Sequence, residues 1–142
     1  MQNTVPISTN EKSLIQTTFP KIAMRSETIT DLFYSQLYWA DQSLIPLFEK
    51  SPREQGRILM RMLGKAIALL DEPDTLIPVI QELGVRHAGY GVKKKDYKIF
   101  GTALMSSLEL VLGESVFNAD VKAAWTVFYN MLASIAIEAA YE

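Results

Sequence analysis

The chain has 142 residues, which suits one domain built around one hydrophobic core. Its formal net charge of −2 indicates neither nucleic acid nor an anionic membrane as a partner. The absence of cysteine excludes disulfides, thiolate metal sites and cysteine nucleophiles. Residues 1–10 lack the pattern of a signal peptide, and the longest apolar runs are too short to span a bilayer, so we expect no membrane contact and a cytoplasmic protein.

Apolar residues recur at helical spacing along the whole chain, and no stretch alternates as a strand would, so the sequence predicts an all-α domain. Residues 1–8 are expected to form a flexible N-terminal segment. The first helix should begin near Ser8, because Ser8 and Glu11 have the spacing of a capping box. Pro20 should bend this helix. A second helix is expected over residues 26–40.

A short turn or irregular helix around Pro46 should end near Phe48. The third helix should start at Ser51-Pro52, where a capping side chain precedes a proline in the first turn. Its apolar stripe comprises Leu59, Met62, Leu63, Ala66, Ile67 and Leu70. Residues 71–74 should stop it. A shorter helix is then expected over about residues 75–88.

The fifth helix should follow Lys93-Lys94-Lys95 and end at Gly113, and the last should run from about Asn118 to Tyr141. Acidic residues at 71, 72 and 74 and the three lysines are typical of solvated helix ends. We find no motif for nucleophilic catalysis or for nucleotide binding. The only histidine is His87. A lone histidine is more often structural or exposed than a metal ligand.

The surroundings of His87 point to a specific family. The segment Leu83-Gly84-Val85-Arg86-His87-Ala88-Gly89-Tyr90-Gly91-Val92 resembles the proximal-histidine segment of bacterial single-domain globins and of the globin part of flavohaemoglobins. Further matches in order along the chain are Leu32-Phe33-Tyr34, Phe48, Gln55, Leu59, Tyr97 and Ala124-Trp125. The resemblance covers residues 8–142. It implies a globin fold of about six to eight helices that enclose one haem.

The resemblance also assigns roles to individual residues. It implies haem b, with His87 as the proximal iron ligand and with Tyr34, Gln55, Leu59 and Phe48 on the distal side. Further haem-pocket residues by family position are Leu63, Leu83, Arg86, Val92, Tyr97, Phe100 and Leu104. Leu63, Phe100 and Leu104 are equally compatible with ordinary core positions. Arg86 and the lysines at 93–95 are the candidates for pairing with the haem propionates.

Because the chain has a single histidine, no second imidazole is available to the iron. We therefore expect a five-coordinate ferrous iron without ligand, and water, hydroxide or Tyr34 on ferric iron. The chain departs from flavohaemoglobins late in the last helix, where a glutamate supports the proximal histidine and tyrosine. The matching position is Ala140, with Glu138 and Glu142 to either side. Strong electron donation from His87 is therefore in question.

Three functions agree with this resemblance. The first is reversible O₂ binding, as a carrier, store or scavenger, because hydrogen-bond donors at Tyr34 and Gln55 favour O₂ over CO. The alternative is oxidation of NO to nitrate, with a separate reductase in place of the two reductase domains that flavohaemoglobins append. The third is a haem-based gas sensor or a regulatory globin. The expected ligands are O₂, NO and CO, and the expected state is a monomer or weak homodimer.

Overall fold

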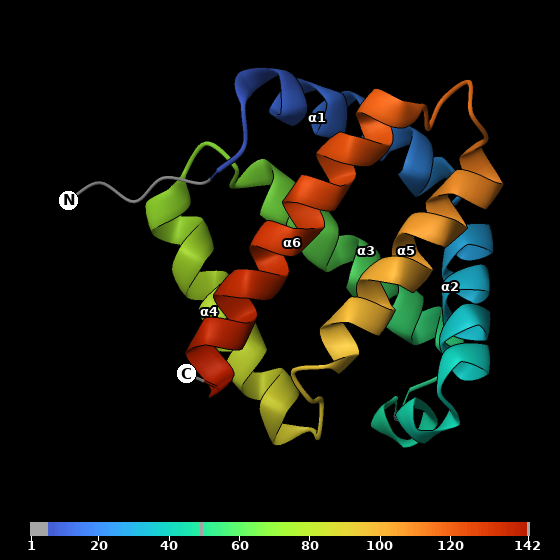
Figure 1. Ribbon diagram of the computed structural model, residues 1–142, viewed down its shortest axis with the longest axis vertical. Coiled ribbons are helices and arrows are strands. Elements are labelled where there is room, and N and C mark those ends of the chain that lie inside the picture. Colours follow the sequence, from blue (N-terminus) through green and yellow to red (C-terminus); the bar gives the residue numbers. More distant parts are fainter. Residues whose placement is uncertain (1–5, 49, 142) are drawn as a thin grey trace.

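The computed structural model describes residues 6–48 and 50–141, and within these ranges it contains helices and no strand, which confirms the predicted all-α class. Figure 1 shows the arrangement. The helices are α1 (Thr9–Met24), α2 (Ser26–Ala40), the 3₁₀ helix η1 (Gln42–Leu47), α3 (Pro52–Ala68), α4 (Pro73–Gly89), α5 (Asp96–Leu112) and α6 (Ala119–Tyr141).

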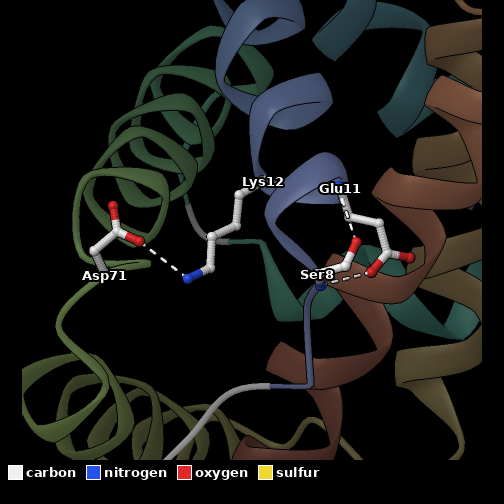
Figure 2. A network of polar contacts seen from close by, with 4 residues as sticks. All are labelled: Ser8, Glu11, Lys12 and Asp71. Atoms are coloured by element: carbon white, nitrogen blue, oxygen red, sulfur yellow. Dashed lines mark hydrogen bonds and ion pairs between the residues drawn. The ribbon is translucent and has the colours of Figure 1, made fainter.

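The start of α1 is set by the predicted capping box. The Glu11 backbone N–H donates to Ser8 Oγ at 3.1 Å, and the Ser8 N–H donates to Glu11 Oε1 at 2.8 Å. One residue further, the Lys12 ammonium pairs with Asp71 at 3.0 Å and ties α1 to the turn after α3 (Figure 2). Of the expected N-terminal segment, residues 1–5 lie outside the described residues, and Ile7 is buried.

Helix α4 corrects one sequence-based prediction. We expected the shortest helix here, over residues 75–88, but α4 has 17 residues, as many as α3 and α5. The prediction treated residues 71–74 as a stop only. Pro73 instead begins α4, because the first helical position needs no backbone N–H and suits the fixed φ of proline. The helix ends at Gly89, and Gly91 follows with a φ of 103°, which glycine adopts without strain.

Two close helix crossings hold the domain together on opposite sides. Helix α4 packs against α6, and α2 packs against α5 and α3 (Figure 1). At the first crossing a side chain on Gly84 would overlap the Ala136 backbone, so only glycine permits this approach. The core between the crossings contains Trp125 and Phe128, which are 0% and 1% exposed. Each such buried aromatic side chain contributes about 2–3 kcal/mol of transfer free energy.

Among the described residues, one helix, α6, has the length and the apolar composition that a bilayer-crossing helix needs. Its burial gives a different reason for this composition. Its inward side chains pack against α1, α4 and α5. These buried residues are Val121, Ala124, Trp125, Phe128, Met131, Leu132 and Ala136. One face of α6 therefore belongs to the hydrophobic core, and 33% of its apolar window is buried.

Candidate functional site

One cavity collects most of the residues that the sequence singled out. Its walls come from α2, α3, α4, α5 and α6, together with the residue that ends η1. The lining residues that had been predicted are Tyr34, Phe48, Gln55, Leu59, Leu63, Leu83, His87, Tyr97, Phe100 and Leu104. They are separated by up to 70 residues in the chain (34 to 104) and meet only through the helix packing.

His87 lies in the last turn of α4 and lines this cavity. Burial lowers the pKa of His87 below its usual range, and the neighbouring Arg86 guanidinium lowers it further. The imidazole is therefore neutral near pH 7 and keeps a lone pair for a metal ion. Its Nδ1 atom is buried and has no hydrogen-bond partner among the described residues.

Tyr97, in the first turn of α5, lies beside His87 with a ring-centroid distance of 6.5 Å. Burial raises the pKa of Tyr97 to about 12, and the nearby Tyr141 contributes to the increase, so its hydroxyl stays protonated. This hydroxyl is also buried without a partner among the described residues. The Tyr97 backbone carbonyl accepts a hydrogen bond from the Tyr129 hydroxyl at 2.6 Å, which fixes the start of α5 against α6.

The opposite end of the cavity carries two polar side chains among aromatic ones. The Tyr34 ring meets Phe33 and Phe48 edge to face, with centroids 5.0 and 5.1 Å away. Burial raises the pKa of Tyr34 to about 12, so its hydroxyl is a permanent hydrogen-bond donor at neutral pH. Gln55 lies in the first turn of α3, and Leu59 follows one turn later. The cavity therefore has two donors at one end and a neutral imidazole at the other.

Two of the predicted pocket residues do not line the cavity. Arg86 is exposed on α4, and Val92 is buried but accepts a hydrogen bond from the Tyr141 hydroxyl through its backbone carbonyl. The lysines at 93–95 are exposed between His87 and Tyr97 in the chain. The Lys93 backbone N–H donates to the buried Asp96 carboxylate at 2.9 Å, which closes the turn that precedes α5.

The proximal glutamate expected from the family pattern has no counterpart at Ala140, which is half-buried on α6. Glu138 is exposed, and Glu142 lies outside the described residues. Within the described part of the chain, no carboxylate bonds to His87 Nδ1 or to the Tyr97 hydroxyl. Next to Ala140, the Tyr141 side chain of α6 interacts electrostatically with Tyr97 and raises its pKa.

Sequence reasoning missed several cavity residues. They are Phe33, Ile58, Met62, Ile80, Tyr129, Leu132, Ala133 and Ala136. Met62 belonged to the predicted apolar stripe of the third helix, so helical spacing placed it in a core. Spacing could not show which part of each stripe faces a cavity, because this depends on where the helices cross.

A sequence model of the globin family matches residues 47–136, and the chain belongs to this family. A flavohaemoprotein of Halalkalibacterium halodurans is 27% identical over 139 residues, which cover 96% of this chain and 34% of the relative. The chain thus spans about a third of the length of this relative. The resemblance that the sequence predicted is therefore confirmed at the level of the family.

Solved structures agree with this assignment. A bacterial globin from Campylobacter jejuni superposes with a TM-score of 0.80 at 20% identity, and the match covers 93% of this chain and 95% of that one. This likeness establishes the fold. A flavohaemoglobin from Malassezia yamatoensis, with bound FAD and haem, has a TM-score of 0.77 at 27% identity and covers 94% of this chain and 36% of its own.

Proposed function

We propose that this protein binds one haem b through His87 and binds O₂ reversibly, as a carrier, store or scavenger. The observation that supports this proposal is the cavity in which a neutral His87 faces Tyr34 and Gln55 across apolar walls. Haem, when bound, would supply an iron able to bind O₂, and His87 is the residue that would hold it.

The residues present fit a haem. A planar, mostly apolar group needs an apolar slot with few polar contacts, and the cavity lined by α2, α3, α4, α5 and α6 supplies one. His87 Nδ1 is buried and has no hydrogen-bond partner among the described residues. The imidazole is neutral, as a nitrogen ligand must be. His87 would thus hold the iron, and Leu59, Leu63, Leu83 and Phe100 would cover the ring.

Each distal residue has a separate task. The Tyr34 hydroxyl and the Gln55 amide would donate hydrogen bonds to the O₂ ligand, which carries partial negative charge. Leu59 and Phe48 would exclude water from this end of the cavity. Since the chain has one histidine, no second imidazole can compete for the ligand position.

The test is reconstitution of the purified protein with haem, followed by absorption spectra of the ferric, ferrous and O₂-exposed forms. The wild type should show an intense Soret band that shifts on reduction and on O₂ addition. His87→Ala should lose the five-coordinate ferrous spectrum, and His87→Gly should regain it when free imidazole is added. Val85→Ala on the exposed side of α4 is the control and should match the wild type. An unchanged spectrum in His87→Ala would refute the proposal.

A second candidate function is NO dioxygenation, favoured by the similarity to a flavohaemoprotein over nearly the whole chain. One NO and one O₂ give one nitrate when one electron is added, and a separate reductase would supply that electron. Tyr34 and Gln55 would serve by retaining O₂ until NO arrives. The test is NO consumption in the presence of a flavin reductase and NADH. Consumption that stops after one turnover would exclude the enzymatic function and leave reversible O₂ binding intact.

A further inference from the structure

The exposed surface of α3 carries a line of positive charge, which we call the basic stripe. Its members are Arg53, Arg57, Arg61 and Lys65, which are spaced four residues apart and are all exposed. Because side chains four residues apart lie on neighbouring turns of a helix, the basic stripe extends for about 18 Å along α3. The chain as a whole has a net charge of −2, so the basic stripe is a local concentration of positive charge on an acidic protein.

Little within the protein neutralises the basic stripe. Arg53 lies 3.9 Å from the Glu27 carboxylate, and the two side chains are 63% and 65% exposed. An ion pair this exposed contributes at most about 1 kcal/mol. Among the described residues, Arg57, Arg61 and Lys65 form no ion pair. Three positive charges of the basic stripe are therefore available to a binding partner.

The basic stripe adjoins the candidate haem site. Ile58 follows Arg57 in the chain and lies one helical turn before Arg61. The Ile58 side chain is 41% exposed and also lines the cavity that contains His87. Met62, which follows Arg61, lines the same cavity. A protein bound to the basic stripe would therefore contact Ile58 and reach the edge of the candidate haem site.

We propose that the basic stripe is the docking surface for an acidic electron-donor protein. The inference rests on the proposed function, because only ferrous iron binds O₂ reversibly, and ferric iron must gain one electron to regain that state. The donor would lose the electron that the iron gains. Electron transfer slows steeply with distance, so the donor has to bind close to the cavity. The basic stripe offers such a position together with a charge that complements an acidic surface.

Charge complementarity predicts how this surface acts on the rate of electron transfer between the two proteins. Opposite surface charges steer proteins together and raise the association rate by roughly 10- to 1,000-fold. Salt weakens this effect, because the Debye length falls from about 10 Å at 0.1 M to about 3 Å at 1 M ionic strength. An anionic membrane fits less well, because a membrane-binding helix inserts an apolar face, and Ile58 is the only exposed large apolar side chain among the described residues of α3.

The first experiment measures docking without electron transfer. The probe is oxidised flavodoxin, an acidic flavoprotein whose reduced form donates single electrons. Flavodoxin is added to the isotope-labelled, haem-loaded protein in its ferrous CO form, and backbone amide signals are followed by NMR. Signals from α3 should shift, with the largest changes near Arg57 and Arg61, and signals from α6 should not. Absence of shifts, or shifts centred on another helix, would overturn the proposal.

The same titration separates this proposal from the proposed function. If the protein binds no haem, the proposed function fails, and the titration is carried out on the protein as purified. Shifts in α3 would then still show that the basic stripe binds an acidic protein, and their absence would exclude it.

The second experiment measures reduction of the ferric, haem-loaded protein by reduced flavodoxin in a stopped-flow instrument. The rate constant should fall steeply between about 0.1 M and 1 M salt. The double variant Arg57→Glu with Arg61→Glu should lower it by about tenfold or more at low salt, and much less at high salt. Arg57→Gln with Arg61→Gln removes the positive charge without adding repulsion to Glu54, and it should give an intermediate rate.

The matched control is Lys98→Glu with Lys122→Glu, at exposed positions on α5 and α6. It changes the net charge equally and should keep most of the wild-type rate. Reduced riboflavin, a small neutral reductant, should reduce all variants alike, because it needs no docking surface. An equal loss of rate in the two glutamate variants, or a rate independent of salt, would overturn the proposal. So would vesicles rich in phosphatidylserine that bind the wild type and not Arg57→Glu with Arg61→Glu, because they would assign the basic stripe to a membrane.

Discussion

Replacing Tyr34 with phenylalanine removes one hydrogen-bond donor from the distal end of the cavity and little else. The Tyr34 ring packs edge to face on Phe33 and Phe48, and a phenylalanine ring keeps both contacts. Burial raises the pKa of Tyr34 to about 12, so the lost group is a neutral hydroxyl at every pH near 7. The variant therefore isolates the hydrogen bond from the shape of the pocket.

The magnitude follows from the donor and its partner. A hydrogen bond contributes about 0.5–1.5 kcal/mol net, and about 1.5–3 kcal/mol when one partner is charged. Because the O₂ ligand is only partly charged, we take about 1.5 kcal/mol for Tyr34, which corresponds to roughly a tenfold change in an equilibrium constant. The loss should appear as an O₂ dissociation rate about ten times faster in Tyr34→Phe.

The assay is stopped-flow displacement of O₂ from the haem-loaded protein, with CO dissociation measured in parallel. Bound CO is less polar than bound O₂, so the CO dissociation rate should change much less in Tyr34→Phe. Tyr90→Phe, at a 69% exposed position just after α4, is the matched control and should leave both rates unchanged. If Tyr34→Phe released O₂ at the wild-type rate, or accelerated O₂ and CO equally, the assignment of Tyr34 as a donor to O₂ would be wrong.

Three further predictions concern the contacts of α6 with α4 and with α5, which position the site. Gly84→Ala should lower the free energy of unfolding by about 1–3 kcal/mol in urea denaturation, because a methyl group there overlaps the Ala136 backbone, and an unchanged midpoint would contradict this crossing. Gly89→Ala is its control and should be neutral or slightly stabilising, since no atom lies within 4 Å of the added carbon. Tyr129→Phe should cost about 0.5–1.5 kcal/mol by removing the 2.6 Å hydrogen bond to the Tyr97 carbonyl, measured in the same way. Burial raises the pKa of Tyr129 above its ordinary value of 10.0, so the folded state binds more protons than the unfolded state at higher pH, and stability should fall as pH rises above 10.0. Tyr129→Phe should make that fall shallower, and equal slopes in the two proteins would refute the cause.

The sequence was sufficient for features that depend on neighbours within a few residues. Ser8 and Glu11 predicted the start of α1, because their two hydrogen bonds are local. Gly113 predicted the end of α5, because its φ of 75° breaks the helix at that residue. The start of α4 at Pro73 is also local, but proline both stops and begins helices, so the same residue supported a wrong boundary.

The order and spacing of His87, Gln55 and Tyr34 identified the family from the sequence alone, and with it the candidate haem site. Only the tertiary structure decided which other side chains surround that site. Ala136 and Tyr129 reach the cavity because α6 crosses α4 and α5 closely at Gly84 and Gly101, where a larger residue would collide.

A further cavity, where α2, η1 and the first turn of α3 meet, was likewise decided by tertiary packing. Both this cavity and the candidate haem site are lined by Tyr34, Phe48 and Gln55. No pattern along the chain encodes that a side chain lines two cavities. The Tyr141 hydroxyl and the Val92 carbonyl join segments 49 residues apart. Local hydrogen bonds and apolar spacing determined where the helices of this globin begin and end. The helix crossings determined what they enclose, because contacts between distant segments form only when the helices pack.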